Sequence, residues 1–409
     1  MLKITNKYAV TSLVFIAGLF HGALFADQFH YKNLIVGERA SGLGGAYTAV
    51  SDDPSGLYYN PAGIVYAQSS SLSASVNAYH TSETTFENAL AGQDWKRTSS
   101  AFLPNFFAVI QPMGPGMVGF SYAVPDSVRE NQDQEFLNPN PAWDRLTVNY
   151  NDEDQTYKIG PSYAIEITKG LSVGATLYLH FRERERIINQ VAVNTLGEHQ
   201  LSNSYFQTRE SGYQPMLGVM WNPFSKISLG LNITKTIITG SKAKTQTIQK
   251  AFTDSIFQQQ TVKISDKREM PTIFSLGVAY FPTNKLMISG DLYHYTATED
   301  AITGTRDAIT NFAFGAEYYM TGSLVLRGGV FSNYANTPGL VEGQTGQNPH
   351  INFYGTSLSL SNVTRNSTVT LGAIYSIGSG LAQVVEGSTE LTDASASTLS
   401  VLLSTSYSY

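Results

Sequence analysis

"LSVGATLYLHFRERER", residues 171–186, alternates between apolar and polar side chains over most of its length. Its odd-numbered positions begin with Leu171, Val173, Ala175, Leu177, Leu179 and Phe181. Its even-numbered positions begin with Ser172, Gly174, Thr176, Tyr178, His180 and Arg182. Successive side chains of a β-strand point to opposite faces, so this stretch predicts a strand with one face toward lipid or a core and the other toward water. Residues 227–236, "ISLGLNITKT", repeat the pattern.

Segments of this kind recur about fourteen times along the chain. They begin near Ser70, Phe102, Met117, Thr156, Leu171, Gln207, Ile227, Thr272, Leu286, Asn311, Leu324, Ile351, Ser367 and Ser397. An even number of alternating segments is typical of a bacterial outer-membrane barrel. We therefore predict an all-β fold, an antiparallel transmembrane β-barrel of about fourteen strands.

The predicted connections support this fold, because short and long ones alternate. Tight links such as "QPMGPG" and "MTGS" follow the even-numbered strands, whereas long polar stretches at 125–154, 183–206 and 240–266 follow odd-numbered ones. Outer-membrane barrels have short turns on the periplasmic side, so both termini are expected in the periplasm. A soluble β-sandwich remains an alternative, because alternation alone does not separate a lipid-facing strand from one facing a core.

The N-terminus has the features of a secretory signal peptide. Lys3 and Lys7 precede an apolar run at residues 8–24, and the small residues Ala23 and Ala26 follow. This order predicts export with cleavage near Ala26, with a membrane anchor as the alternative. The 409-residue chain has no cysteine, which excludes a disulfide framework and a lipoprotein anchor. Its net charge of -6 provides no basic field for nucleic acid.

A glycine-rich stretch lies between the signal peptide and the first strand. Residues 37–63 read "GERASGLGGAYTAVSDDPSGLYYNPAG", with small side chains around most of the glycines. Small residues allow tight turns and close backbone approach, which suits a plug folded within a barrel lumen better than a solvated linker. We expect a signal peptide at 1–26, a plug or hatch at 27–68 and a transmembrane barrel at 69–409.

This stretch resembles the N-terminal hatch of the FadL family, outer-membrane transporters of long-chain fatty acids and related hydrocarbons. The resemblance is carried by the glycine- and alanine-rich run, an aspartate near its middle and the element Asn60-Pro61-Ala62, followed by Gly63. It implies a barrel of about fourteen strands, an apolar ligand held within it, and gating by the hatch at these four residues. Elsewhere in the chain the resemblance is architectural.

The resemblance also implies a lateral opening caused by a kink in the third strand. The third predicted strand is "GMVGFSYAVPD", residues 116–126. Gly119 in its middle has no side chain, and Pro125 near its end cannot donate a ladder hydrogen bond, so either could mark the opening. The plain alternative for Gly119 is a glycine in an ordinary strand.

A fatty acid would need a cation for its carboxylate. The cations that alternation places on polar faces, and that we select as candidates, are Lys158, Arg182, Arg184 and Arg327. An alternative for "RERER" is that it extends above the bilayer and pairs with loop acids or with lipopolysaccharide phosphate. An alternative for Arg327 is a structural ion pair with Glu317. The acids of 125–154 are expected on a solvated extracellular face.

Two classes of function follow. The first is passive uptake of long-chain fatty acids or other hydrophobic small molecules; the second is a non-transporting barrel of similar build, acting as a secretion adaptor or surface-binding protein. The scattered histidines do not suggest a catalytic constellation, and the acids of "SDDPSG" lack calcium-loop spacing, so we expect no enzyme, metal or cofactor. The expected partners are outer-membrane lipid or lipopolysaccharide and the barrel-assembly machinery, with the barrel a monomer.

Overall fold

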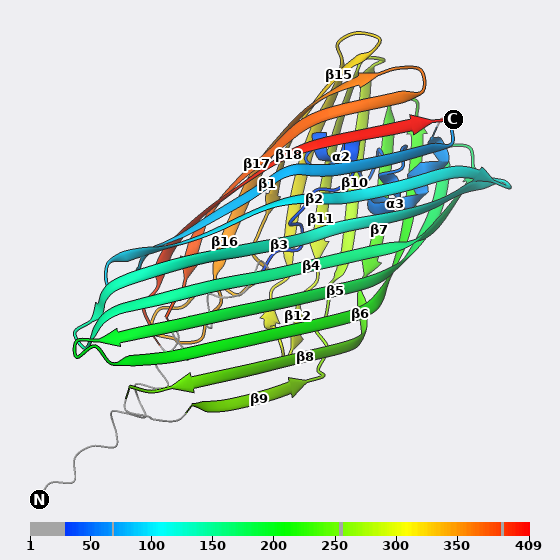
Figure 1. Ribbon diagram of the computed structural model, residues 1–409. Helices are drawn as coiled ribbons and strands as arrows, with labels where there is room; N and C mark the ends of the chain where they lie inside the picture. Colours follow the sequence, from blue (N-terminus) through cyan, green and yellow to red (C-terminus); the bar gives the residue numbers. More distant parts are fainter. Residues whose placement is uncertain (1–28, 68, 253–256, 386–387) are drawn as a thin grey trace, which may run out of the picture.

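The protein is a closed antiparallel β-barrel of fourteen strands, as predicted. A computed structural model describes residues 29–67, 69–252, 257–385 and 388–409, and the expected signal peptide lies outside them (Figure 1). The barrel strands are β1 (Ser71–Leu90), β2 (Gln93–Met113), β3 (Gly116–Asn140), β4 (Trp143–Thr168), β5 (Leu171–Asn194), β6 (His199–Phe224), β7 (Ile227–Lys235), β10 (Thr272–Thr283), β11 (Leu286–Tyr295), β14 (Ile309–Tyr319), β15 (Leu324–Asn333), β16 (His350–Val363), β17 (Ser367–Ala382) and β18 (Thr392–Ser408). Each pairs with its neighbours in sequence, and β1 pairs with β18.

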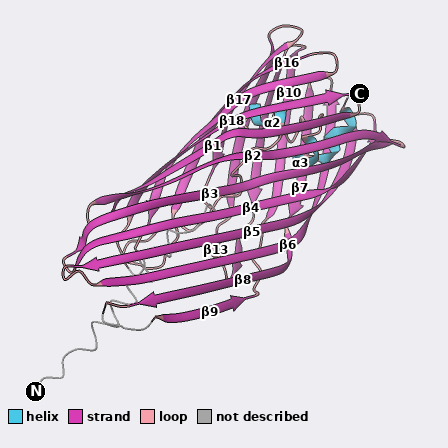
Figure 2. Cartoon of the chain, viewed as in Figure 1, coloured by secondary structure: helices cyan, strands magenta, loops and turns pink. Residues whose placement is uncertain are grey.

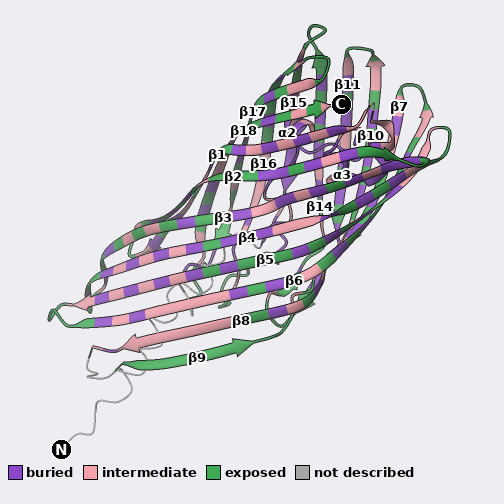
Figure 3. Ribbon diagram, turned by 45° about the vertical axis from the view of Figure 1, so that its right-hand side comes forward, coloured by how far each residue is buried: buried purple, intermediate pink, exposed green. Residues whose placement is uncertain are grey.

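The alternation seen in the sequence decides which face of each strand points outward. On β5, Leu177, Leu179 and Phe181 are about half exposed, whereas Tyr178 and His180 between them are buried. Figure 3 shows the same change between buried and exposed residues along the neighbouring strands. The outer surface is therefore apolar and the interior polar, which is the arrangement a barrel needs in lipid.

The strands on one side of the barrel are far longer than a membrane requires. A transmembrane strand needs about 9–11 residues, whereas β3 has 25 and β4 and β6 have 26 each. The predicted polar loops at 125–154 and 183–206 are therefore wrong, because most of these residues belong to paired strands. Strands β2, β4 and β6 also begin well before the predicted positions, at Gln93, Trp143 and His199.

Four further strands lie outside the ring of fourteen: β8 (Ile237–Lys250), β9 (Gln258–Ile264), β12 (Thr298–Asp300) and β13 (Gly304–Arg306). Strand β8 continues β7 after a one-residue break and pairs with the distal half of β6, and β9 pairs with β8. Together they extend the sheet beyond the barrel rim, as Figure 1 shows. Strands β12 and β13 form a separate small hairpin.

The short turns and the ends of the barrel domain lie at the same end. Ser71 at the start of β1 pairs with Ser408 at the end of β18, and also with Ile110, next to the turn between β2 and β3. The backbone N–H of Tyr409 donates to the carbonyl oxygen of Ser70 at 3.0 Å. The end of the barrel that carries these short turns is called the turn end.

Residues 29–67, here called the N-terminal segment, pack against the inward faces of the strands. The segment contains α2 (Glu38–Gly42), α3 (Gly56–Tyr59) and the 3-10 helix η1 (Pro61–Tyr66), which Figure 2 shows among the strands. A Cβ added to Gly230 of β7 would lie 2.2 Å from the carbonyl oxygen of Thr48, so this approach requires glycine. None of the helices in the described part of the chain has the length and apolar character needed to cross a bilayer.

Candidate functional site

The element Asn60-Pro61-Ala62 fixes the N-terminal segment to the barrel wall. The side-chain Nδ2 of Asn60 donates to the carbonyl oxygens of Thr48, at 2.9 Å, and of Val219 on β6, at 3.0 Å. Its Oδ1 accepts from the N–H of Ala62, while Pro61 begins η1. Both polar ends of this fully buried side chain are therefore satisfied.

A buried carboxylate holds the middle of the N-terminal segment. Oδ2 of Asp291 on β11 accepts hydrogen bonds from the backbone N–H groups of Tyr47 and Thr48, both at 2.8 Å, and from the hydroxyl of Tyr293 at 2.7 Å. Asp291 was not among the predicted site residues. The sequence feature that could have identified Asp291 is its position as an acid on the inward face of an alternating strand.

An ion-pair cluster ties α2 to β14 and β15. Arg39 donates two hydrogen bonds to Glu317, at 2.7 and 2.8 Å, and Arg327 donates to the same carboxylate at 2.6 Å. Arg39 also pairs with Asp52 within the segment. The structural alternative for Arg327 is therefore confirmed, and this residue is not among those that line the cavities described below.

A cavity of about 160 Å³, here called the first cavity, lies between the N-terminal segment and strands β3 to β11 and is partly open to solvent. Much of its lining is aromatic or apolar. This part of the lining is formed by Tyr58, Tyr59, Tyr295, Met216, Ile273 and Leu34. Such a composition, with a few polar groups among apolar ones, is typical of a small-molecule site.

Two lysines reach into the first cavity. Nζ of Lys32 lies 4.2 Å from the ring centroid of Tyr293, and Nζ of Lys158 lies 5.6 Å from that of Tyr58. Among the described residues, Lys32 Nζ is buried without a hydrogen-bond partner. Burial lowers the pKa of Lys32 to about 8, although the nearby Asp291 carboxylate opposes this shift. Lys158 was predicted; Lys32 was not, because it precedes the strands.

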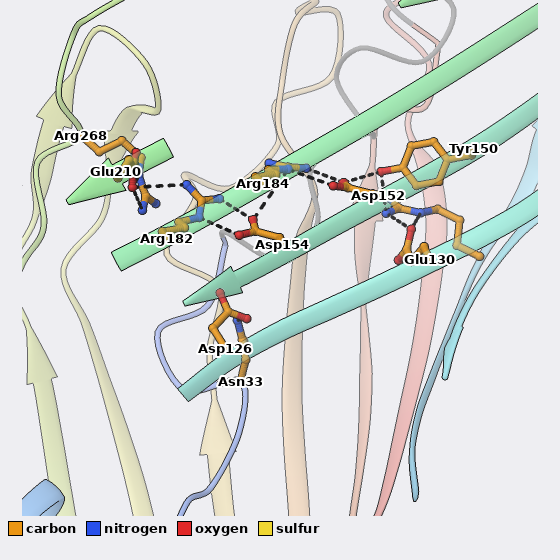
Figure 4. A network of polar contacts seen from close by, with 11 residues as sticks. Asn33, Asp126, Glu130, Tyr150, Asp152, Asp154, Arg182, Arg184, Glu210 and Arg268 are labelled. Carbon is orange, nitrogen blue, oxygen red and sulfur yellow. Dashed lines mark hydrogen bonds and ion pairs between the residues drawn. The ribbon is translucent and has the colours of Figure 1, made fainter. Parts of the chain in front are cut away.

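Beyond the membrane-sized part of the wall, charged side chains form a connected series on the inner faces of β2 to β6. Figure 4 shows most of the members of this series together. In order of contact, the series consists of Arg97, Glu130, Tyr150, Asp152, Arg184, Asp154, Arg182, Glu210 and Arg268. Arg97 and Glu130 line the second cavity described below, and Arg182 and Arg268 line the first. The series therefore runs from one cavity to the other.

Two predicted carboxylate-binding residues belong to this series. Nε of Arg182 donates to Asp154 at 2.8 Å, and NH2 of Arg184 donates to Asp152 at 2.6 Å. Burial raises the pKa of Asp154, but Arg182 and its hydrogen bonds, with help from Arg184, outweigh burial and leave it below the usual value. Arg182 borders the first cavity and Arg184 does not. The expectation of solvated acids at 125–154 is wrong for Asp152 and Asp154, which are buried.

The barrel wall is interrupted between β2 and β3. Their ladder pairs Phe106 with Ala123 and, further from the turn end, only Ser99 with Glu130. Residues 100–105 and 124–129 are therefore unpaired with each other, and so are residues 93–98 and 131–140 beyond the single pair. The register is the same on both sides and places Pro104 opposite Pro125. Neither proline has an N–H to donate, so the cross-strand hydrogen bonds are lost at this point. We call this interruption the β2–β3 gap.

The gap does not coincide with Gly119, which pairs regularly with Ile110 on β2 and Ser162 on β4. A Cβ on Gly119 would lie 2.5 Å from a methyl carbon of Leu57, so this glycine makes room for the N-terminal segment. The β3–β4 register instead shifts between Ala123 and Asp126. Of the two residues singled out in this strand, Pro125 is the one at the interruption.

Residues 29–35, here called the arm, cross the lumen beside the gap. On one side, Leu34 N–H donates to the Pro125 carbonyl at 3.1 Å and Asn33 Nδ2 donates to Asp126 at 3.0 Å. The far end of the arm is held by three hydrogen bonds. These join Asn336 N–H to the Phe29 carbonyl at 2.8 Å, a ring nitrogen of His30 to the Ile351 carbonyl at 2.7 Å, and Asn333 Nδ2 to the Lys32 carbonyl at 3.0 Å.

The arm separates the first cavity from a second one of about 120 Å³. The second cavity is lined by Phe86, Ile351 and Phe353 together with polar side chains from β1 to β3. Pro125 and Asp126 of the gap border the first cavity, whereas Ser127 and Val128 border the second. Both cavities therefore reach the wall where its ladder is open.

The fold is that of the FadL-type barrels. The chain is similar to a crystal structure of a FadL homologue from Pseudomonas aeruginosa, with a TM-score of 0.65 over 93% of this chain and 99% of that one, at 13% identity. It is similar to the P. putida toluene transporter TodX, with a TM-score of 0.69, 94% and 99% coverage and 13% identity. It is also similar to the Ralstonia pickettii toluene transporter TbuX, with a TM-score of 0.64 over 92% of this chain and 99% of that one, at 12% identity. No protein-family model matches the sequence, and no curated protein matches it.

Proposed function

We propose that the protein is a FadL-family channel of the bacterial outer membrane that takes up amphipathic molecules with an apolar body and a carboxylate, long-chain fatty acids being the leading class. The observation that carries this proposal is the first cavity: an apolar, tyrosine-rich chamber with two lysines, bordered by an interruption of the wall. Residues 1–26 are then a signal peptide, 27–68 a hatch and 69–409 the barrel, with both termini in the periplasm.

The arrangement supports movement through the wall rather than along the barrel axis. The N-terminal segment fills the turn end so closely that several inward glycines contact its backbone, which leaves little room for a passage past it. The β2–β3 gap offers the ligand a sideways exit into lipid, where an apolar molecule is stable without a carrier. The flow needs no energy source when the ligand moves down its gradient.

The arm is the proposed gate. It lies across the lumen at the gap, and hydrogen bonds of Leu34 and Asn33 hold it to β3. The Asn60-Pro61-Ala62 element and Gly63 form the anchored base from which the arm moves, because Asn60 is bonded to β6. Displacement of the arm would join the two cavities and expose the gap.

The proposed specificity for carboxylates rests on Lys32 and Lys158. A buried ammonium without a hydrogen-bond partner is costly, and a ligand carboxylate would supply the missing acceptor. Arg182 and Arg268 border the same chamber but already bind acidic side chains, so they define its polar end rather than the ligand contact. A neutral hydrocarbon would leave both lysines unpaired.

The test compares binding and uptake of oleate and toluene by the wild type and by a Lys32→Gln/Lys158→Gln variant. Lys169→Gln/Lys285→Gln, on the exposed turns, removes the same charge elsewhere and is the matched control. A hydrogen bond to a charged group is worth about 1.5–3 kcal/mol, so oleate affinity should fall about tenfold or more in the first variant only. Toluene binding should not fall.

Uptake is measured in cells whose own importer is deleted, at equal surface levels of each variant. Asn60→Ala/Pro61→Ala should bind oleate but lose uptake, because the hatch loses its anchor. A correctly inserted wild-type barrel that neither binds nor transports oleate or toluene would contradict the proposal. That result would favour the alternative of a secretion adaptor or surface-binding barrel.

A further inference from the structure

Four cations gather on the outward face of the extended sheet. They are Arg209 on β6, Lys242 and Lys244 on β8, and Lys263 on β9, here called the basic patch. The alternate residues Glu210 and Ser241 are buried, which places Arg209 and Lys242 on the outer side of the sheet. The patch therefore faces away from the lumen and from both cavities.

The register brings like charges directly opposite each other. Arg209 pairs with Lys242 across β6 and β8, and Lys244 pairs with Lys263 across β8 and β9. Directly opposed side chains have Cβ atoms about 4.5–5.5 Å apart, and like charges at this separation destabilise a sheet. Two such pairs on adjoining strands are unfavourable unless an anion lies between them.

The protein itself supplies little compensation. Arg209 binds Glu183 of β5 at 2.8 Å. Within the described ranges, Lys242, Lys244 and Lys263 make no ion pair. Nζ of Lys244 lies 5.7 Å from the ring centroid of Tyr205. Three exposed or half-exposed ammonium groups thus remain for an external anion.

The patch lies just beyond the apolar band. On β6 and β8 the continuous run of outward apolar positions ends at Tyr213, which is opposite Ile237. Arg209 is four residues further along β6, about 13 Å along the strand and roughly 9 Å in depth at a tilt of 45°. The polar zone of a bilayer begins at the edge of its hydrocarbon core, so the patch is at head-group level.

We propose that the basic patch binds the phosphate groups of the outer-leaflet glycolipid, lipopolysaccharide. The proposal rests on the outer-membrane location and the orientation proposed above, with the long strands outward. Phosphates at the opposed pairs would neutralise the three unpaired lysines, and each contact to a surface charge adds about 1 kcal/mol. The alternative that "RERER" binds lipopolysaccharide is wrong, because its arginines are buried and its outward residues are Glu183 and Glu185.

The experiment uses the full barrel purified in detergent and titrated with bisphosphorylated lipid A, with bound lipid counted by native mass spectrometry. The test variant is Lys242→Gln/Lys244→Gln/Lys263→Gln. The control is Lys169→Gln/Lys226→Gln/Lys285→Gln, three exposed lysines at the turn end. We expect at least tenfold weaker binding in the test variant only, and equally weak binding of dephosphorylated lipid A to the wild type.

Two results would overturn the proposal. One is equal lipid A binding by the two triple variants; the other is equal binding of phosphorylated and dephosphorylated lipid A by the wild type, which would assign the contact to the acyl chains. A third result would also contradict the proposal: soluble polyglutamate that displaces bound lipid A as effectively as free lipid A does would show a general polyanion site. Oleate binding is measured in the same samples, so failure of the patch and failure of the channel are distinguishable.

Discussion

Pro104 of β2 lies opposite Pro125 of β3 in the ladder register, so the two strands present two residues without a backbone donor at the same level of the wall. The carbonyl of Pro125 is instead bonded by Leu34 of the arm at 3.1 Å. The Pro125 carbonyl oxygen thus accepts its hydrogen bond from the N-terminal segment, and this residue has no ladder partner on β2 or β4.

The proline pair should control the exit. Pro104→Val/Pro125→Val restores both donors and favours pairing across the gap, so oleate uptake should fall several-fold while oleate binding to the purified barrel is retained. Pro215→Val, on the outward face of the regularly paired β6, is the control and should leave uptake unchanged. Unchanged uptake in the double variant would show that ligands do not leave at this gap.

Fixing the arm to the wall should block transport reversibly. The chain has no cysteine, so Asn33→Cys/Asp126→Cys introduces the only reactive pair, at positions whose side chains now meet at 3.0 Å. Oxidised protein should bind oleate without passing it, and a reductant should restore uptake. Each single cysteine variant serves as the control. Full uptake with the bridge verified by mass spectrometry would exclude the arm as the gate.

Carboxylate binding should depend on pH through Lys32. Burial lowers the pKa of this ammonium to about 8, so it is charged below that pH and loses its charge above it, while a carboxylate is ionised throughout. Affinity for a short soluble carboxylate should therefore be constant near pH 6–7 and fall above pH 8. Lys32→Arg should reduce this fall and Lys32→Arg/Lys158→Arg should remove it, because arginine stays charged. A flat wild-type profile from pH 6 to 10 would contradict the assignment.

The cluster of Arg39, Glu317 and Arg327 should stabilise the N-terminal segment. Glu317→Gln leaves the buried guanidinium of Arg327 and the partly buried one of Arg39 without their shared carboxylate, and breaking a buried pair costs about 3–5 kcal/mol. Hydrogen exchange of residues 38–48 should therefore accelerate strongly. Glu153→Gln removes the exposed pair with Arg129 and should cost less than about 1 kcal/mol. Equal protection of 38–48 in both variants would contradict the role of the cluster.

The strand pattern could be predicted from sequence where one face meets lipid. Leu177, Leu179 and Phe181 are apolar because they point outward, and the period of two is then visible. Beyond the lipid the same strands continue, but residues 151–156 of β4 are polar on both faces, and Asp152 and Asp154 are paired with arginines inside. Local sequence cannot distinguish such residues from a solvated loop, which is why β4 was predicted to begin near Thr156 rather than at Trp143.

The candidate site was predictable only in part. The alternation of side chains along a strand placed Lys158 inward, and the resemblance to the FadL hatch drew attention to Asn60. Lys32 and Asp291 were missed because their importance depends on a contact between the start of the chain and β11, which no local pattern encodes. The opening was expected at Gly119 or Pro125, and the ladder is open at Pro125; the proline opposite it, Pro104, was missed because the two meet only when β2 and β3 are paired.

The contacts of the N-terminal segment also constrain the order of assembly. Asn60 is bonded to β6, Arg39 to β14 and the arm to β16, while the ring itself closes only when β1 pairs with the C-terminal strand β18. Contacts between such distant parts of a chain form slowly, because they require most of the chain to be in place. Residues 29–67, although synthesised before every barrel strand, are therefore among the last to reach their native positions.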